Sequence, residues 1–428
     1  MSKIKKTEER RDTYVSPRWS NEFLDCGMPM TFDTYNLCSY RCQYCFSFYQ
    51  RIHMKNYAQN NIKWVNVDKV KKIFLEPDSS QFGEYVKQRK PLQWGGLSEP
   101  FDLLEPHFGI GLKLLKFFRE IDYPVAFSTK SVWWVKDKRY VDVIKGAKNF
   151  HFKWSIITLD KEKASKIERG VPSPQSRLEA IGEVAKWGTA GVVLRLRPFI
   201  IGISDPTYLD LIREGAKKGV QSLSTEFFCL ELRADNRVKR RYMEMSKICG
   251  YDMYKFYRKN SKGSGYLRLN YEIKREYVEK MQKLCKEVGI GFFVSDAHHK
   301  EKCDHGNCCG LPKDKYFGNY QKCQYTEAIV FAKKHGEVRF SDITKHSHEY
   351  FKKVMARDVM HSGDGSSYFH KTLYDYMRWC WNHPKKCGSS PWNYFGKMLI
   401  PIKNLDENGD VIYKFNRKQY GQSSNSEK

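Results

Sequence analysis

Long apolar segments are missing from this sequence of 428 residues. No stretch approaches the roughly 18 to 20 consecutive apolar residues that a membrane-spanning helix needs, and the mean hydropathy is −0.66. The basic N-terminal stretch MSKIKKTEERRD contains no apolar core, so no secretory signal is visible. We therefore expect no membrane partner and a cytoplasmic location.

Acidic residues are also scarce. Asp and Glu total 49 against 75 Lys and Arg, which gives a formal net charge of +26. Such an excess of positive charge is typical of proteins that bind polyanions. We expect nucleic acid as the partner, with a merely soluble basic surface as the alternative. The length allows one large domain or two to three smaller ones, and no internal repeat is visible.

Cysteine, in contrast, is plentiful, and the 13 cysteines are an odd number. Without a secretory signal, a framework of disulfides is disfavoured, and metal or redox chemistry explains the thiols better. Two short segments, 38–45 and 303–323, hold seven of them. These segments are the first places to look for chemistry.

Short β-rich runs alternate with helical patterns between about residues 26 and 228. This alternation predicts parallel βαβ units. Near the C-terminus, residues 398–415 read as a hairpin centred on Asn408-Gly409. The expected strands are 124–131, 150–158, 190–203, 220–228 and 290–296, and the expected helices are 174–188, 206–219, 276–288 and 368–381.

The composition changes along the chain and predicts five parts. Within the third part, residues 231–271 interleave Arg and Lys with Tyr and Phe. That pattern suits phosphate contacts and base stacking, and a solvated helical insertion is the alternative. The parts are a basic N-terminal arm (1–25), a core (26–228), a basic-aromatic insertion with the end of the core (229–297), a cysteine-rich region (298–345) and a C-terminal extension (346–428).

The first cysteine group is Cys38-x3-Cys42-x2-Cys45. Three thiolates at such short spacing suit one compact polynuclear centre. A zinc site would require a fourth Cys or His nearby, and the residues that follow offer none before His53. Three ligands on a four-iron cluster would instead leave one iron open to bind another molecule.

This spacing, with an aromatic residue before the third cysteine, resembles the radical S-adenosylmethionine superfamily. Further motifs occur in order across about residues 30–205 and resemble its spore photoproduct lyase-like branch. Each motif is weak alone, but their order makes the resemblance specific. They are WGGLSEPFD (94–102), FSTKS (127–131), SIIT (155–158), IERGVPSP (167–174) and RLEAI (177–181).

The resemblance implies an α/β fold, a partial (β/α)6 TIM-like barrel of the radical SAM type, with a 4Fe-4S cluster on Cys38, Cys42 and Cys45. Sites in such barrels lie at the C-terminal ends of the strands. The open iron would bind S-adenosyl-L-methionine. An electron from a reductant such as flavodoxin or ferredoxin would then cleave it to methionine and a 5′-deoxyadenosyl radical.

The resemblance also implies which residues hold S-adenosylmethionine. Tyr44 would flank the adenine, Lys130 would pair with the carboxylate, and Ser155 would contact the ribose or carboxylate. Arg195 and Arg197 lie two apart on a predicted strand, so both face the same side. We expect an inward-facing pair, with Arg197 binding the cofactor, and a solvated face is the alternative. The backbone that the methionine end would approach is that of Gly95, Gly96, Ser98 and Glu99.

One position departs from the family pattern. The lyases carry a hydrogen-donating cysteine where this sequence has Gly96, and no cysteine lies between Cys45 and Cys229. Repair of a thymine lesion by that chemistry is therefore not expected. The same radical generator would serve a different substrate.

The second cysteine group lies in a glycine-punctuated stretch after an expected strand. We predict that it holds an auxiliary iron–sulfur cluster, with a zinc site ligated by Cys and His as the alternative. Adjacent cysteines point in different directions in most backbone conformations, which argues against both binding one centre. A further group, Cys380-x2-His383-x3-Cys387, either supplies a third pair of ligands, joins this loop or is incidental. The predicted ligands are Cys303, Cys308, Cys309 and Cys323.

Together these features predict a radical SAM enzyme that takes a hydrogen atom from a substrate carbon. The favoured substrate is a base within nucleic acid, preferably DNA, because of the charge, the aromatic content and the family resemblance. A radical enzyme acting on a peptide or small molecule is one alternative. A non-catalytic nucleic-acid-binding iron–sulfur protein is the other, and it would not need the cofactor motifs.

Overall fold

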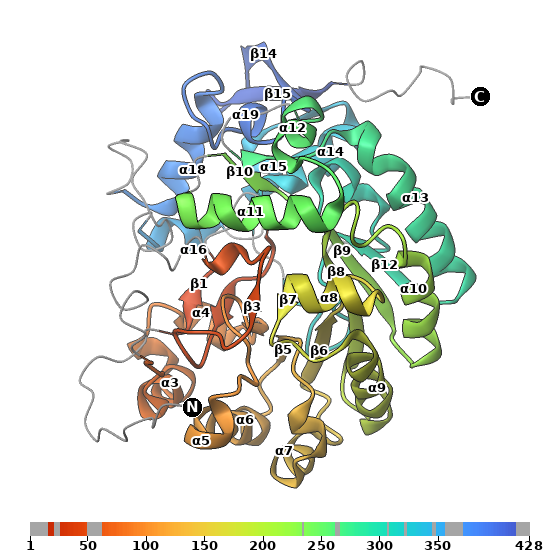
Figure 1. Ribbon diagram of the computed structural model, residues 1–428. Coiled ribbons are helices and arrows are strands. Elements are labelled where there is room, and N and C mark those ends of the chain that lie inside the picture. The colour runs from red at the N-terminus through yellow and green to blue at the C-terminus, as the bar shows by residue number, and fades with distance from the viewer. Residues whose placement is uncertain are drawn as a thin grey trace.

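A computed structural model describes most of the chain (Figure 1). Of the basic N-terminal arm (1–25), the structure describes residues 16–20. None of the described helices is both long and apolar enough to cross a membrane. The described residues are 16–20, 26–48, 62–232, 235–261, 266–305, 308–320, 323–344, 348–355 and 371–416.

The core is one eight-stranded sheet in the order β1-β2-β4-β5-β6-β8-β9-β12. All neighbouring strands are parallel except β1, which pairs antiparallel with β2. The predicted α/β class with a parallel barrel-like sheet is confirmed, with one parallel strand more than six. The strands are β1 Arg18–Trp19, β2 Met30–Phe32, β4 Leu92–Trp94, β5 Val125–Thr129, β6 Phe150–Ser155, β8 Gly191–Phe199, β9 Ser222–Phe227 and β12 Gly291–Val294.

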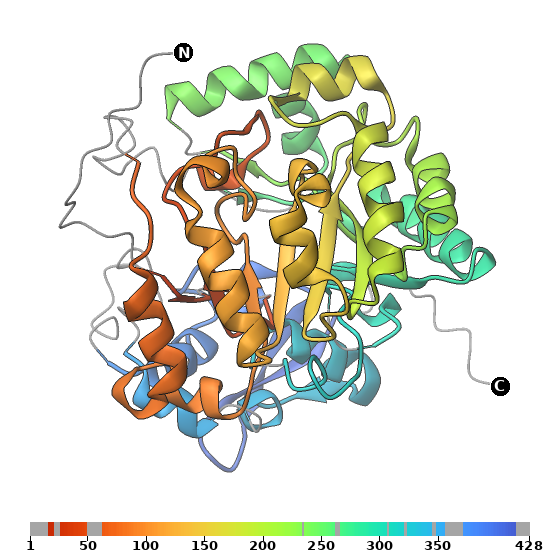
Figure 2. The same cartoon turned by 90° about the horizontal axis from the view of Figure 1, so that it is seen from below.

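Helices follow the strands around the outside of this sheet, and Figure 2 shows them succeeding one another in chain order from orange to green. Caps define several of them: Ser173 accepts from the Ser176 amide at the start of α9, next to Pro174 in its first turn. The helices are α3 Val67–Leu75, η1 Pro77–Ser79, α4 Gly83–Lys87, α5 Glu105–Phe108, α6 Ile110–Glu120, η2 Trp133–Lys136, α7 Lys138–Ile144, α8 Lys161–Ile167, α9 Pro174–Val184, η3 Ala185–Trp187, α10 Tyr208–Lys217 and α13 Tyr271–Glu287.

The two faces of the sheet differ in chemistry. Toward the helices, Phe152 and Trp154 of β6 stack with Trp134 at ring-centroid distances of 5.3 and 5.4 Å. The alternate residues of β6, including Lys153, face the other way, because successive strand side chains point to opposite sides. Apolar burial therefore lies between sheet and helices, and the interior of the barrel carries polar side chains.

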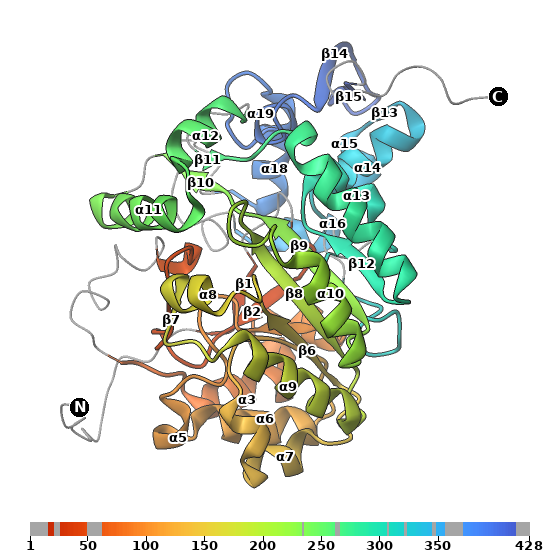
Figure 3. The same cartoon turned by 45° about the vertical axis from the view of Figure 1, so that its right-hand side comes forward.

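The remaining elements gather at one end of the barrel (Figure 3). The insertion forms α11 and α12, and α11 lies beside α8. The hairpin predicted at 398–415 is present, with Gly409 at φ 75° in its turn. These elements are β3 Arg41–Cys42, β7 Glu168–Arg169, β10 Leu230–Glu231, α11 Asn236–Cys249, α12 Met253–Lys259, β11 Tyr266–Leu267, η4 Ala297–Lys302, α14 Thr326–His335, β13 Glu337–Val338, α15 Phe340–Thr344, α16 His348–Lys353, α18 Leu373–Asn382, α19 Pro391–Tyr394, β14 Leu399–Leu405 and β15 Val411–Phe415.

All five expected strands and all four expected helices in the listed ranges are present, with shifted ends. The strand predicted at 190–203 ends at Phe199, after which Ile200 and Ser204 form a turn closed by a 2.8 Å backbone hydrogen bond. The helix predicted at 276–288 begins earlier, at Tyr271, following Asn270. Both differences concern ends, where local turns decide the boundary.

Candidate active site

The first cysteine group lies on a loop that follows β2. Two of its residues form β3, which pairs antiparallel with β7, and the Gln43 amide donates to the Ile167 carbonyl at 2.8 Å. Asp102 holds the start of the loop by accepting from the Ser39 amide at 2.7 Å. Cys42 and Cys45 are joined by a turn in which the Cys45 amide donates to the Cys42 carbonyl, and Cys38 lies on the same loop just before β3.

Burial in this loop keeps the thiols of Cys38 and Cys42 protonated while no metal is bound. Burial raises the pKa of Cys42 to about 12. Burial also raises the pKa of Cys38 well above its ordinary value, and the carboxylate of Asp102 and the neighbouring thiols add to that rise. Since metals bind thiolates, loading this loop must release protons.

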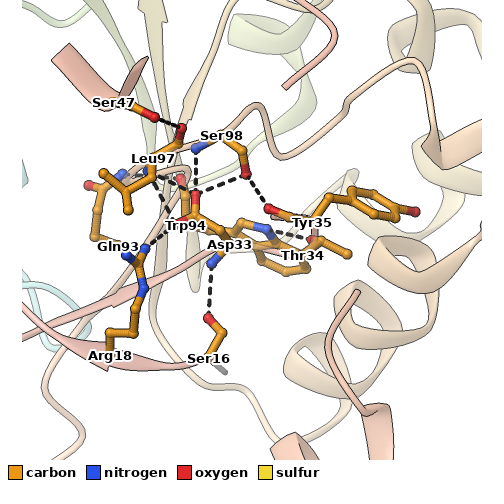
Figure 4. A network of polar contacts seen from close by, with 10 residues as sticks. All are labelled: Ser16, Arg18, Asp33, Thr34, Tyr35, Ser47, Gln93, Trp94, Leu97 and Ser98. Atoms are coloured by element: carbon orange, nitrogen blue, oxygen red, sulfur yellow. Dashed lines mark hydrogen bonds and ion pairs between the residues drawn. The ribbon is translucent and has the colours of Figure 1, made fainter. Parts of the chain in front are cut away.

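A buried carboxylate shapes the loop after β4 (Figure 4). Asp33 accepts hydrogen bonds from the amides of Leu97 and Ser98 at 2.9 and 2.7 Å and forms an ion pair with Arg18. Ser98 Oγ donates to the Tyr35 carbonyl at 3.1 Å. The backbone of this loop is therefore preorganised, and Asp33 is a residue that the sequence motifs did not single out.

Two glycines in this loop leave no room for a side chain. Gly95 has φ +92°, and a Cβ there would stand 2.6 Å from the Ser128 carbonyl oxygen. A Cβ on Gly96 would stand 1.9 Å from Thr31 Oγ1. A cysteine at position 96 would therefore require Thr31 to move. In this chain, Thr31 occupies the space that the family cysteine would need.

Glu99 and Lys130 meet at the ends of β4 and β5. The Lys130 amide donates to Glu99 Oε2 at 2.9 Å, and Thr129 Oγ1 donates to the other carboxylate oxygen. Burial raises the pKa of Glu99 to about 7 despite these hydrogen bonds. The Lys130 ammonium lies 5.7 Å from the ring centroid of Tyr44, so two predicted cofactor residues are neighbours.

A buried ion pair fastens Tyr44 to the barrel. The Tyr44 hydroxyl donates to Glu168, and Arg177 pairs with the other oxygen of Glu168 at 2.6 Å. Arg177 also donates to the carbonyl of Ser155, another predicted cofactor residue, at 2.6 Å. Glu168 and Arg177 fall within the sequence motifs, but their pairing was not predicted.

The expected inward-facing arginine pair is present on β8. Arg195 lies opposite Ser155 of β6 and Ser224 of β9 in the register of the sheet. Arg197 pairs with Glu226 of β9. The two arginines therefore face the barrel interior, which excludes the solvated face as their setting.

The second cysteine group lies against the last strands of the sheet. Cys303 lies against β12, where its sulfur accepts from the Val294 amide at 3.2 Å, and the Cys308 carbonyl accepts from Ser224 Oγ of β9 at 2.8 Å. Cys323 is fully buried, and together with Cys380 and Cys387 it adds to the rise that burial causes in the pKa of Tyr325. All thirteen cysteines are free thiols. Within the described ranges, no three or more Cys, His, Asp or Glu side chains are arranged to hold a metal ion.

The basic-aromatic insertion is partly core. Tyr242 and Tyr257 are 0% and 1% exposed, and the Tyr257 hydroxyl donates to the Phe228 carbonyl, so neither ring is free to stack on a base. Arg241 lies over the ring of Phe48 at 3.3 Å and donates to the Cys42 carbonyl at 3.1 Å. The prediction of a stacking platform is wrong for these tyrosines, and Arg241 braces the first cysteine loop.

A hollow of about 610 Å³ lies between α15, α18 and the hairpin turn. None of the predicted site residues lines it. Its lining residues are Phe340, Ser341, Thr344, Tyr374, Arg378, Asn408 and Asp410.

Comparisons with known proteins complete the description. No protein-family model and no curated protein matches the chain. Among solved structures, a spore photoproduct lyase variant with bound AdoMet and dinucleoside spore photoproduct is similar at 19% identity and a TM-score of 0.47, over 65% of this chain and 80% of that one. Streptococcus suis SuiB bound to S-adenosylmethionine is similar at 14% identity and a TM-score of 0.39, over 63% and 51%.

Proposed function

We propose that this protein is a radical SAM enzyme, which cleaves S-adenosylmethionine reductively and abstracts a hydrogen atom from a substrate carbon. The observation that carries the proposal is the attachment of the cysteine loop to the loop after β4. Ser47 Oγ donates to the Leu97 carbonyl at 2.6 Å, and Ser39 binds Asp102. The motif cysteines and the motif glycines, about 50 residues apart in sequence, are thereby held together.

The donor set fits the cofactors by its chemistry. Cys38, Cys42 and Cys45 are three free thiols on one short loop, which suits a cluster that keeps one iron open. When bound, this cluster would supply the electron that splits S-adenosylmethionine into methionine and a 5′-deoxyadenosyl radical. The chain's task is to orient the cofactor, with Lys130 facing its carboxylate and Tyr44 its adenine.

The rest of the cofactor site consists of backbone and fixed side chains. Gly95 and Gly96 present bare backbone, and the hydrogen bonds to Asp33 hold Ser98 and its neighbours in place before any ligand arrives. Preorganised polar groups of this kind lower the cost of orienting a ligand. Ser155 is tied through its carbonyl to Arg177, which leaves its hydroxyl for the cofactor.

Formation of 5′-deoxyadenosine tests this function. The protein should be reconstituted anaerobically with iron and sulfide, then given S-adenosylmethionine and dithionite. We expect 5′-deoxyadenosine to accumulate. Its absence, with four irons bound per chain, would contradict the proposal and favour a non-catalytic iron–sulfur protein.

For the substrate we propose a base within nucleic acid, with a peptide or small molecule as the alternative. The support is the net charge of +26 and the exposed cations of α11, which lie on the helix that braces the cysteine loop. Lys239 and Arg240 are exposed there, while Arg237 pairs with Asp235. A reductant such as flavodoxin or ferredoxin and a cytoplasmic setting belong to the same proposal, since thirteen free thiols suit a reducing compartment.

The salt dependence of DNA affinity tests the proposed contact between the cations of α11 and the phosphate backbone. Each phosphate neutralised contributes close to one unit to the slope of log affinity against log salt. Replacing Lys239 and Arg240 with Ala should lower the slope by about two and weaken DNA binding across sequences. Lys280→Ala with Lys283→Ala, which removes two exposed lysines from α13, is the control and should leave the slope unchanged. Absence of salt-sensitive binding to any DNA or RNA would contradict the nucleic-acid proposal and favour a peptide.

A second metal centre in the loop 298–323 is also part of the proposal. Cys303, Cys308, Cys309 and Cys323 are its candidate ligands. With two four-iron clusters, a reconstituted chain should contain about eight irons, and the triple variant of Cys38, Cys42 and Cys45 should keep about half. About one zinc and almost no iron in that variant would favour a zinc site.

A further inference from the structure

Three positively charged side chains meet inside the barrel. Lys153 of β6 and Arg195 and Arg197 of β8 extend from neighbouring parallel strands to the interior face. Lys153 is 2% exposed, and its ammonium donates to Gln93 Oε1, a neutral partner. Buried cations are costly unless an anion or several hydrogen bonds accompany them, so this cluster requires a partner.

The negative charge available within the barrel is insufficient. Among the residues that the structure describes, Glu226 is the one carboxylate that forms an ion pair with any of these three cations, and it pairs with Arg197. Of the three cations, Arg197 is therefore the one with a carboxylate partner in this part of the structure. Nothing in the described parts of the chain makes a hydrogen bond or ion pair with the Arg195 guanidinium, and Arg197 Nε is buried without a partner.

The thiols of the second cysteine group lie near this cluster and also near Lys300. Cys309 helps to raise the pKa of Lys153 against the larger effect of burial, and Cys308, Cys303 and Cys309 help to raise the pKa of Lys300. For Arg197 the largest electrostatic influence after burial is Glu226. The thiols are therefore shared between Lys300 and the cluster, and in the described residues no carboxylate forms an ion pair with Lys153 or Arg195.

The cluster is also within reach of solvent. The side chains of Arg197 and Glu226 are 16% and 34% exposed, whereas Lys153 is almost fully buried. The cluster is thus partly accessible at Arg197 and Glu226 and buried at Lys153. Arg195 of the cluster lies directly opposite Ser155, which belongs to the proposed cofactor site.

We propose that Lys153, Arg195 and Arg197 form the binding site for a phosphate group of the substrate. Two guanidinium groups and an ammonium offer the forked and point-like donors that phosphate oxygens accept. A substrate anchored here would present its adjoining carbon skeleton toward Ser155 and the radical source. The inference rests on the proposed function, because it states that the substrate of the proposed radical reaction carries a phosphate group. Arg197 is thereby assigned to the substrate and not to the cofactor.

Binding of inorganic phosphate to the full chain tests the site without any turnover. We expect saturable binding by calorimetry at low ionic strength, and weaker binding by about ten- to a hundredfold in Lys153→Gln and Arg195→Gln. Arg195→Lys, which keeps the charge and loses the fork, should fall between wild type and Arg195→Gln. Arg213→Gln removes an exposed arginine from α10 and should bind phosphate as the wild type does.

Glu226→Gln should change phosphate affinity in the opposite direction from the cation variants. Removing the carboxylate frees Arg197 and increases the positive excess, so phosphate affinity should rise by about three- to tenfold. A purely structural role for these residues predicts no gain from that change. Weaker binding in Glu226→Gln, or equal binding in wild type and all three cation variants, would overturn the inference.

Two further ligands identify the source of the phosphate. A nucleoside 5′-monophosphate should compete with inorganic phosphate if the substrate is a free nucleotide, while a short single-stranded oligonucleotide should compete more strongly if it is a nucleotide within a strand. The unphosphorylated nucleoside is the control and should not compete. Competition by neither phosphorylated ligand would contradict a nucleotide substrate. Since none of these measurements uses S-adenosylmethionine, a failure here is distinguishable from a failure to form 5′-deoxyadenosine.

Discussion

Replacing Cys38, Cys42 or Cys45 with Ala should each reduce 5′-deoxyadenosine formation to the level of a protein-free blank. With three thiolates available, every ligand is needed, because the loss of one leaves a second iron without a protein ligand and destabilises the cluster. The measurement is 5′-deoxyadenosine by mass spectrometry after anaerobic reconstitution and reduction with dithionite. Iron content, determined in parallel, should fall by about four per chain.

Cys249→Ala is the matched control for these variants. Cys249 is a half-buried free thiol at the end of α11, where burial raises its pKa to about 12, and it belongs to neither cysteine group. This variant should form 5′-deoxyadenosine at the wild-type rate. If one of the three loop variants also kept the wild-type rate, the radical proposal would be wrong.

The barrel could be predicted from the sequence because its signals are local. A five-residue buried strand such as β5 and the amphipathic helix that precedes it are each visible in a short window of sequence. The cysteine spacing and the glycine pair are likewise contiguous, so the chemistry of the site could be proposed before its geometry. That Arg195 and Arg197 share one side followed from the two-residue period of a strand, while the choice between the interior and a solvated face needed the sheet register.

What the sequence could not supply are contacts between distant segments. Arg241 reads as a phosphate-binding residue in a basic run, yet it lies on Phe48 and binds the Cys42 carbonyl, 199 positions away. Tyr257 reads as a stacking residue until its burial beneath Phe228 is known.

The ion pair between Glu168 and Arg177 carries the largest stability effect that we expect. Both side chains are 1% exposed, and Glu168 also accepts from Tyr44 of the cysteine loop. Arg177→Met would leave the carboxylate buried without its counter-charge, which should lower the free energy of unfolding by about 3–5 kcal/mol. Denaturant titration of the full chain measures this loss. Arg213→Met, which breaks the exposed pair with Asp210 on α10, should cost less than about 1 kcal/mol.

Two further measurements separate a lost charge pair from lost packing. The double variant Glu168→Gln with Arg177→Met should recover part of the loss, because no uncompensated charge remains buried. A double variant no more stable than Arg177→Met would attribute the effect to packing. The Arg177 guanidinium lowers the pKa of Glu168, so the wild-type pair stabilises the fold above the ordinary glutamate pKa, and that contribution is lost as the pH falls through the lowered value. Acid should therefore destabilise the wild type through this pair. The double variant has no charge at either position and should lack that part of the acid dependence. At neutral pH it should also hold Tyr44, and with it the cysteine loop, less firmly.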